Sequence, residues 1–296
     1  EKQKMLESVK LEMQAHNAAA YENLPAREKA IHQKAFTCNE GDPGFHQLAE
    51  LRFNDGGVER KMLVPKGDVL HQFRTDVKTG ALPTVSWLVA PENFSDHPGA
   101  PWYGAWYVSE VLDILTQNPE VWKKTIFILT YDENDGYFDH VPPFVAPHPH
   151  KPGTGKASPG IDTGPEFVTL SQENDRKGFP SGYHRESSIG LGYRVPLVIA
   201  SPWSRGGFVN SEVFDHTSSI QFLETFLSKK TGKQVKEANI TEWRRAICGN
   251  LTSVFRPWQQ EKIPTPEFLS RNDVLVGIKQ AEFKRLPTDY KSLSPQ

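Results

Sequence analysis

Four carboxylates and a histidine lie within fifteen residues of this 296-residue chain, in the stretch LTYDENDGYFDHVPP that begins at Leu129. The first two carboxylates, Asp132 and Glu133, directly follow the apolar run TIFIL and the dipeptide TY. Side chains of like charge repel each other, and removing them from water is costly unless a positive charge lies among them. A hard divalent cation bound by carboxylate oxygens would relieve this repulsion. The alternative is a solvated turn without a metal.

Three histidines, in polar loops or at the start of a helix, are further candidates. His97 lies in SDHP beside Asp96, and it is a candidate to bind a phosphate, act as a general acid or ligate a metal, with simple solvation as the alternative. His140 either closes its loop by hydrogen bonding or acts directly. His216, in FDHTSS, is predicted to begin a helix capped by Asp215 or a neighbouring hydroxyl, and a helix N-terminus favours an anion.

Arginines and aromatic residues complete the set of candidates. Arg194 and Arg205 flank an apolar run, so they either hold a phosphate or form surface ion pairs. Trp102 and Tyr103 belong to the cluster PWYGAWY, which also holds two further aromatic residues. Such a cluster either packs over the edge of a sheet or holds a quaternary ammonium group by cation–π contact.

Three apolar runs end in these polar loops and are predicted to be buried strands. They are Thr84–Pro91, Ile126–Thr130 and the run YRVPLVIASPW that begins at Tyr193. Amphipathic helical segments separate them, as in WYVSEVLDILTQNP. Strands that alternate with helices predict an α/β fold with a mostly parallel sheet flanked by helices. Sites in such sheets gather beyond the carboxyl ends of the strands, so the three loops are expected to meet there.

The other segments have clear local signals. Residues 1–35 are predicted to be helical, and residues 47–65 to form a hairpin that turns at NDGG. Residues 68–80 predict a helix that ends at Gly80. Residues 141–186 are rich in Pro, Gly and His and predict a long loop excursion, which is typical of functional or mobile segments. Residues 259–296 predict an extended tail.

Composition excludes some classes of protein. A net charge of −2 and a pI near 6.6 exclude a broad basic surface for nucleic acid. The chain has no run of eighteen apolar residues, so no membrane-spanning helix is expected, and the charged, helix-like start does not resemble a signal peptide. No boundary is evident, so residues 1–296 are predicted to form a single domain. Cys38 and Cys248 either pair or remain free thiols.

Three long motifs, in this order, resemble the bacterial phosphoesterase family. They are LPTVSWLVAPENFSDHP, TQNPEVWKKTIFILTYDENDGYFDHVPP and GLGYRVPLVIASPWSRGGFVNSEVFDHTSSIQFLE. The family includes phosphocholine-preferring phospholipases C, to which the motifs are most similar, and an acid phosphatase branch. The resemblance implies an alkaline phosphatase-like fold and one divalent metal ion bound by Asp132 and Glu133. Turn-making and orienting roles are then left to Asp135 and Asp139. It also implies that His97 contacts the phosphate or protonates the leaving group.

The sequence departs from the family in one large respect. The family's early Q-E-N-R-S-F-D-H motif, with its metal-binding Glu-Asn pair, has no counterpart here, and neither has its nucleophile segment. We therefore expect the chain to correspond to the carboxyl half of a catalytic domain, apparently incomplete, and to need the missing half or a second chain for activity. A divided sheet would also leave an unpaired edge.

The predicted function is that of a phospholipase C, which hydrolyses phosphatidylcholine-type phosphodiesters to diacylglycerol and phosphocholine in the full-length parent. The alternatives are an acid phosphatase acting on phosphomonoesters and an inactive fragment or interaction module. His97 and His216 are the predicted catalytic residues, and Trp102, Tyr103 and Arg194 the predicted substrate-binding residues. Phospholipid is the expected substrate, with peripheral membrane contact, and the resemblance implies a periplasmic or secreted protein.

Overall fold

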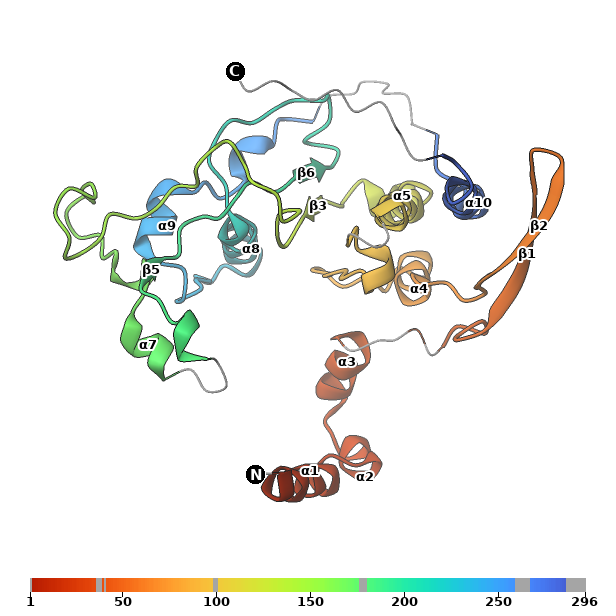
Figure 1. The fold of residues 1–296 in the computed structure, drawn as a ribbon, viewed down its shortest axis with the longest axis horizontal. Helices are drawn as coiled ribbons and strands as arrows, with labels where there is room; N and C mark the ends of the chain where they lie inside the picture. Colours follow the sequence, from red (N-terminus) through yellow and green to blue (C-terminus); the bar gives the residue numbers. More distant parts are fainter. Residues whose placement is uncertain are drawn as a thin grey trace. The chain divides into compact units, whose positions relative to one another are not determined.

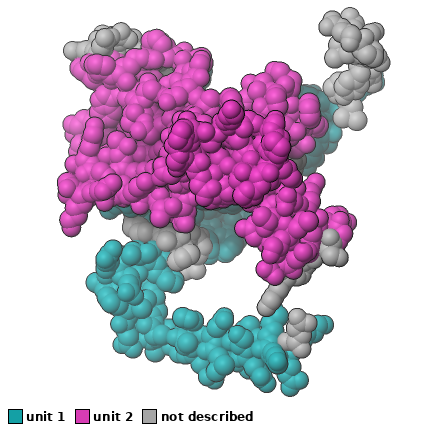
Figure 2. All heavy atoms as spheres, turned by 90° about the vertical axis from the view of Figure 1, so that its left-hand side faces the viewer, with its two compact units in different colours: residues 1–118, 267–296 teal, residues 119–266 magenta. Residues whose placement is uncertain are grey.

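The computed structural model describes residues 2–35, 39, 41–97, 101–175, 180–258 and 267–285. The chain divides into two compact units (Figure 2): unit 1 contains residues 1–118 and 267–296, and unit 2 contains residues 119–266. Each unit has buried residues of its own. The single domain expected for residues 1–296 stays a prediction.

Unit 1 begins with three helices in place of the single helical segment predicted for residues 1–35. They are α1 (Lys2–Ala15), α2 (Ala18–Glu22) and α3 (Ala26–Ala35). The side chain of Asn17 caps α2, because its Oδ1 accepts a hydrogen bond from the N–H of Ala20 at 2.9 Å. All side chains of α1 are exposed, so local propensity and not a core supports this helix.

The predicted hairpin is confirmed. Strands β1 (Leu48–Asp55) and β2 (Val58–Pro65) pair antiparallel, from Leu48 opposite Pro65 to Asp55 opposite Val58. The turn needs two residues with positive φ, which Gly56 and Gly57 supply at 59° and 93°.

The core of unit 1 lies among three helices, α4 (His71–Thr79), α5 (Pro101–Thr116) and α10 (Arg271–Ala281), which lie side by side in Figure 1. Helix α4 ends at Gly80, whose φ is 71°, as predicted. Helix α10 lies within residues 259–296, so part of the predicted extended tail is a helix. Its Leu275 is buried, and that burial offsets part of the cost of ordering the segment. The buried side chains of these helices include Phe73, Val77, Trp106, Val111, Leu115 and Leu275.

The run Thr84–Pro91 does not form the predicted strand. Its Trp87 is 67% exposed and its Val89 85% exposed, and no described strand pairs with it. An apolar run becomes a strand only where a second strand completes its hydrogen bonds, and none does so here. The chain continues through a short 3₁₀ turn, η1 (Glu92–Phe94), toward His97.

The two other predicted strands of the main sheet are present, but they pair antiparallel. In unit 2, β3 (Phe127–Thr130) pairs with β6 (Leu197–Ala200), from Phe127 opposite Ala200 to Thr130 opposite Leu197. Parallel strands need a covering crossover, usually a helix, whereas the described residues between the two strands, 131–175 and 180–196, contain only short elements. Every strand pair among the described residues is antiparallel, so the mostly parallel sheet is not found in them. The mixture of helices and strands is confirmed, and the alkaline phosphatase-like fold stays a prediction.

The excursion predicted for residues 141–186 contains several short elements. They are η2 (Gly164–Glu166), β4 (Phe167–Val168), α7 (Leu170–Asn174) and η3 (Ser181–Tyr183). Strand β4 pairs antiparallel with β5 (Ser187–Ser188), which follows the excursion.

Besides α7, the described helices of unit 2 include α6 (Pro119–Trp122), α8 (His216–Thr231) and α9 (Glu242–Ile247), followed by the 3₁₀ turn η4 (Thr252–Val254). Helix α8 begins as predicted, with Asp215 as its N-cap. The buried residues of this unit include Glu166, Ser201, Ser218, Trp243, Cys248 and Leu251. Within the described residues, no helix combines the length and the apolar character needed to cross a membrane.

Candidate functional site

The acidic pair lies at the exposed end of β3. Thr130 ends the strand, and both Asp132 and Glu133 are exposed. The backbone N–H of Glu133 donates to Oδ1 of Asp132 at 3.1 Å. Across the ranges that the structure describes, neither carboxylate has an ion-pair partner. Their remaining oxygens therefore stay available to a ligand from solution.

The two later carboxylates of the stretch hold the loop itself. Asp135 accepts the N–H of Tyr137 at 2.9 Å. Asp139 accepts the N–H of Val141 at 3.1 Å and binds Arg194 through both of its oxygens, each at 2.8 Å from a guanidinium nitrogen. The hydrogen bonds from Arg194, followed by that from Val141, hold the pKa of Asp139 well below its usual range. Both residues thus have the turn-making and orienting roles predicted for them.

Arg194 and His140 are placed by Asp139. Arg194 forms the ion pair that the sequence left open as an alternative, because its Nε and Nη2 both donate to the Asp139 carboxylate. A phosphate contact from this arginine stays a prediction. His140 is exposed, with Nδ1 3.5 Å from Oδ1 of Asp139.

Helix α8 brings His216 to the acidic stretch. Nε2 of His216 lies 2.8 Å from the carbonyl oxygen of Tyr131, the residue before Asp132. A carbonyl oxygen can only accept a hydrogen bond, so Nε2 carries the hydrogen and donates. The structure therefore brings His216, predicted to be catalytic, to the backbone that carries the predicted metal-binding pair.

A buried ionic group of Arg244, Glu166 and Asp215 holds the start of α8. The sequence did not predict it. Arg244 of α9 binds Glu166 through two hydrogen bonds, of 3.0 and 2.9 Å, and binds the cap residue Asp215 at 2.6 Å. Glu166 is 1% exposed. Of these three residues, only Asp215 could be recognised from its neighbours in the sequence, as a helix cap. Arg244 and Glu166 lie 78 residues apart in the sequence, where no periodicity connects them.

The remaining predicted site residues lie in unit 1. His97 is exposed, and Asp96 before it has a φ of 66°. This loop lies directly on α5 because Gly104 has no side chain there: a Cβ on Gly104 would be 2.5 Å from the backbone nitrogen of Asp96. Within unit 1, the loop that carries His97 is thus fixed close to Trp102 and Tyr103, which lie on the same turn of α5.

The aromatic cluster divides between core and surface. Trp106 and Tyr107 are buried, and both contact Phe94. The ring centroid of Phe94 lies 5.6 Å from that of Trp106 and 6.5 Å from that of Tyr107. Tyr103 is half-buried and also contacts Phe94 at 5.9 Å, and burial raises the pKa of its hydroxyl. Trp102 is 68% exposed. Packing therefore accounts for most of the cluster, and Trp102 remains available for a ligand.

The sequence profile of the Phosphoesterase family matches residues 46–228, a segment that contains the acidic stretch, both predicted catalytic histidines and the aromatic cluster. This chain belongs to the Phosphoesterase family. The resemblance that the three motifs carry is thereby confirmed.

Several curated relatives in this family are phospholipases C. The chain is 46% identical to the non-hemolytic phospholipase C of Pseudomonas aeruginosa over 212 residues, which are 70% of this chain and 28% of that protein. It is 45% identical to the hemolytic phospholipase C of the same organism over 202 residues, 68% of this chain and 24% of the relative. Phospholipase C A of Mycobacterium tuberculosis is 40% identical over 214 residues, 71% of this chain and 36% of the relative. The chain thus spans about a quarter to a third of the length of these phosphoesterases.

The oxygen donors of the acidic pair fit part of a metal site. Two exposed carboxylates without an ion-pair partner are ligands that a hard divalent cation accepts. Such a cation takes about six ligands, and no group of three or more His, Cys, Asp or Glu residues in the described part of the chain is arranged to hold one. Asp132 and Glu133 therefore fit a cation as two of its ligands and do not complete its shell.

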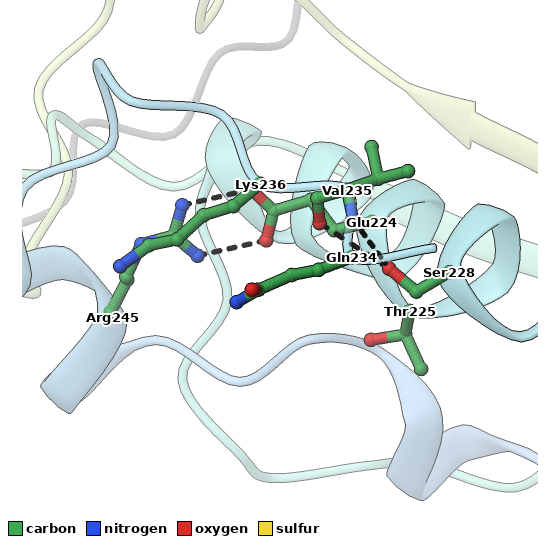
Figure 3. Close-up of a pocket in the computed structure, with 7 residues that line it drawn as sticks. All are labelled: Glu224, Thr225, Ser228, Gln234, Val235, Lys236 and Arg245. Carbon is green, nitrogen blue, oxygen red and sulfur yellow. Dashed lines mark hydrogen bonds and ion pairs between the residues drawn. The ribbon is translucent and has the colours of Figure 1, made fainter. Parts of the chain in front are cut away.

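Two other features of unit 2 lie outside the candidate site. A shallow pocket between α8 and the segment before α9 contains the ion pair of Glu224 and Arg245, whose two hydrogen bonds are both 2.8 Å long (Figure 3). None of the predicted site residues lines it. Cys248 is a buried free thiol, and burial raises its pKa to about 12. Cys38 lies outside the described residues.

Proposed function

We propose that this chain supplies part of the catalytic site of a phospholipase C, which hydrolyses phosphatidylcholine-type phosphodiesters to diacylglycerol and phosphocholine. The observation that carries the proposal is the juxtaposition at the end of β3. There, two exposed carboxylates without an ion-pair partner in the described chain lie next to a histidine held by the Tyr131 carbonyl. The names of the relatives support the reaction class.

In this proposal, Asp132 and Glu133 are two of the ligands of one divalent metal ion. When bound, such an ion polarises the phosphoryl oxygens and screens the negative charge that develops on them. The exposure of both carboxylates means that they bind the ion without first leaving another cation. Asp139 and Arg194 keep the loop in the shape that presents the pair.

The two histidines act on the phosphate group. His97 grips a phosphate oxygen or gives a proton to the leaving alkoxide. His216 uses Nε2–H to donate to the Tyr131 carbonyl, so Nδ1 is the ring nitrogen left for the substrate, and it donates to a phosphate oxygen once it is protonated. Trp102, which is exposed, covers the quaternary ammonium headgroup by cation–π contact, and the half-buried Tyr103 supports it.

Activity also needs groups that these 296 residues do not contain. The sequence has no counterpart of the family's early metal-binding and nucleophile motifs, so we propose that another part of the protein or a second chain supplies them. On this proposal the chain alone is inactive. We further propose a periplasmic or secreted location and peripheral contact with phospholipid.

The test compares this chain with a form extended at its N-terminus, using p-nitrophenylphosphorylcholine and p-nitrophenyl phosphate as substrates. The extended form is expected to hydrolyse the phosphodiester faster than the phosphomonoester. The chain alone is expected to hydrolyse neither substrate. Phosphocholine and inorganic phosphate are then compared as inhibitors. Inhibition by phosphate with no effect of choline analogues would exclude the phospholipase C and favour an acid phosphatase. Turnover by the chain alone would show that it already contains a nucleophile.

A further inference from the structure

Three buried ionised side chains join the long excursion to the start of α8. The carboxylate of Glu166 accepts three hydrogen bonds: two from Arg244, at 3.0 and 2.9 Å, and one from the hydroxyl of Thr241 at 2.5 Å. Nη2 of Arg244 also donates to the carbonyl oxygen of Gly190 at 2.9 Å. A planar guanidinium held by a bidentate carboxylate has little rotational freedom, so the position of Arg244 is fixed by the excursion.

The same arginine holds the cap of α8. Nη1 of Arg244 donates to Oδ2 of Asp215 at 2.6 Å, and Oδ1 of Asp215 accepts the N–H and the hydroxyl of Thr217, at 2.9 and 2.6 Å. The Asp215 side chain is 3% exposed. One oxygen of the cap therefore belongs to the helix and the other to Arg244. Without the guanidinium, Oδ2 would lose its charged donor and the carboxylate could rotate away from Thr217.

His216 follows this cap directly. Its backbone links Asp215 to the first turn of α8, so the orientation of the cap sets the direction in which the His216 side chain leaves the helix. The 2.8 Å contact of Nε2 with the Tyr131 carbonyl is therefore adjacent to the group that Arg244 fixes. This hydrogen bond to the Tyr131 carbonyl selects the Nε2–H tautomer in the neutral ring, which leaves the lone pair on Nδ1.

We infer that Arg244 and Glu166 are positioning residues for His216. By holding Asp215 they keep the His216 ring against the Tyr131 carbonyl, in the Nε2–H tautomer, next to Asp132. The use of Nδ1 in hydrolysis rests on the proposed function, whereas the positioning of the ring does not.

Helix α9 offers a matched control for a purely structural role. Arg245, the next residue, makes a bidentate ion pair with Glu224 and donates to the carbonyl oxygen of Glu237 at 2.7 Å. The Arg244 and Arg245 side chains are equally buried, at 16% and 15% exposed. The Arg245 pair has no hydrogen bond to Asp215 or His216 among the described contacts. Arg245→Gln thus breaks a similar ion pair without touching the cap.

The experiment records the ring nitrogens of His216 by long-range ¹H–¹⁵N NMR in ¹⁵N-histidine-labelled chain, with His216→Gln to assign the signals. Spectra of all variants are taken at one pH, near 8, so that their ring-nitrogen shifts can be compared directly. The unsubstituted chain and Arg245→Gln are expected to show the Nε2–H pattern alone. Arg244→Gln is expected to move both nitrogen shifts toward the average of the two tautomers. An unchanged pattern in a folded Arg244→Gln chain would overturn the inference.

Asp215→Ser provides the same test if Arg244→Gln does not fold. Serine still caps a helix, and this change leaves Arg244 and Glu166 as a neutral pair. The mixed-tautomer pattern is expected, and a retained Nε2–H pattern would overturn the inference.

Activity is then measured in the extended form of the protein. Arg244→Gln is expected to lower kcat for p-nitrophenylphosphorylcholine by on the order of tenfold, with KM unchanged, and Arg245→Gln to leave both unchanged. If no form hydrolyses the phosphodiester while the NMR pattern changes as expected, the positioning stands and the proposed function fails.

Discussion

Two groups of carboxylates in unit 2 differ in what neutralises their charge. Glu166, Asp215 and Asp139 each accept hydrogen bonds from an arginine, and their side chains are 1%, 3% and 12% exposed. Asp132 and Glu133 are exposed and have no arginine partner among the described residues. The two kinds differ in what neutralises them, because folding itself supplies a cation to the first group and leaves the second group hydrated.

This difference separates carboxylates that build the site from carboxylates that are free to bind. A carboxylate already held by a guanidinium must lose that partner before it can ligate a metal ion, whereas a hydrated one exchanges only water. The buried group contains two carboxylates but only one arginine, since Glu166 and Asp215 share Arg244. Removing the shared cation should therefore be the most damaging change of all.

The largest expected effect is on stability, from Arg244→Met. It leaves two buried carboxylates without a cation, for which the expected loss is about 3–5 kcal/mol of unfolding free energy. Glu166→Gln should cost only about 1–2 kcal/mol, because Arg244 keeps Asp215 as its partner and the amide oxygen still accepts hydrogen bonds at one of the two carboxylate positions. Urea denaturation of the chain measures both. Equal losses in the two variants would mean that the shared arginine is not the centre of the group.

The next effect is on turnover, from Asp132→Ala in the extended form of the protein. Loss of a metal ligand should lower kcat by more than the roughly hundredfold typical of residues that only orient ligands, and should remove the bound metal. In the 296-residue chain without metal, the same substitution should change the free energy of unfolding by less than about 0.5 kcal/mol, because the side chain is exposed.

Asp135→Asn is the control for Asp132→Ala. The amide oxygen can still accept the N–H of Tyr137, so metal content and turnover should both be retained. Elemental analysis of the purified variants decides the matter, and an Asp132→Ala protein with its full metal content would remove Asp132 from the set of ligands.

The smallest effect concerns Asp139 and depends on pH. Its pKa is depressed in the folded chain, mainly by Arg194, relative to the usual value of about 3.9. A depressed pKa stabilises the fold above the unfolded value, and this stabilisation is lost as the pH falls below it. The gap in urea midpoint between the unsubstituted chain and Asp139→Asn should therefore be constant from about pH 5 to 8 and shrink below about pH 4.

The Arg194→Gln background tests the cause of this pH dependence. Without the guanidinium, the Asp139→Asn substitution should produce a smaller gap with a weaker dependence on pH. If the gap in that background still shrinks to the same extent below pH 4, another group and not Arg194 lowers the pKa of Asp139.

Features with local causes were predictable from the sequence. The turn at Asn54–Gly57, the end of α4 at Gly80 and the cap of α8 at Asp215 each depend on a few neighbouring residues whose conformational preferences are strong. The same holds for the acidic pair, which the strand before it places at a strand end.

Features that depend on distant partners were not predictable in this way. The run Thr84–Pro91 has strand-like composition, but composition does not reveal that no described strand pairs with it. The direction of pairing between β3 and β6 depends on the connection and not on the strands themselves. Arg244 meets Asp215 across 29 residues of sequence and Glu166 across 78, and neither pair leaves a periodic signal.

Cys248 gives the molecule a built-in reporter of local opening. A thiol with a pKa of about 12 is almost entirely protonated at neutral pH, and only the thiolate reacts with disulfide reagents. Cys248 is also buried, and the neighbouring Asp215 contributes to its raised pKa. It can therefore be modified only during the moments when this part of unit 2 opens. The rate at which a disulfide reagent labels Cys248 in the native chain therefore reports how often this region opens. The region includes the Asp215 cap on which the position of His216 depends.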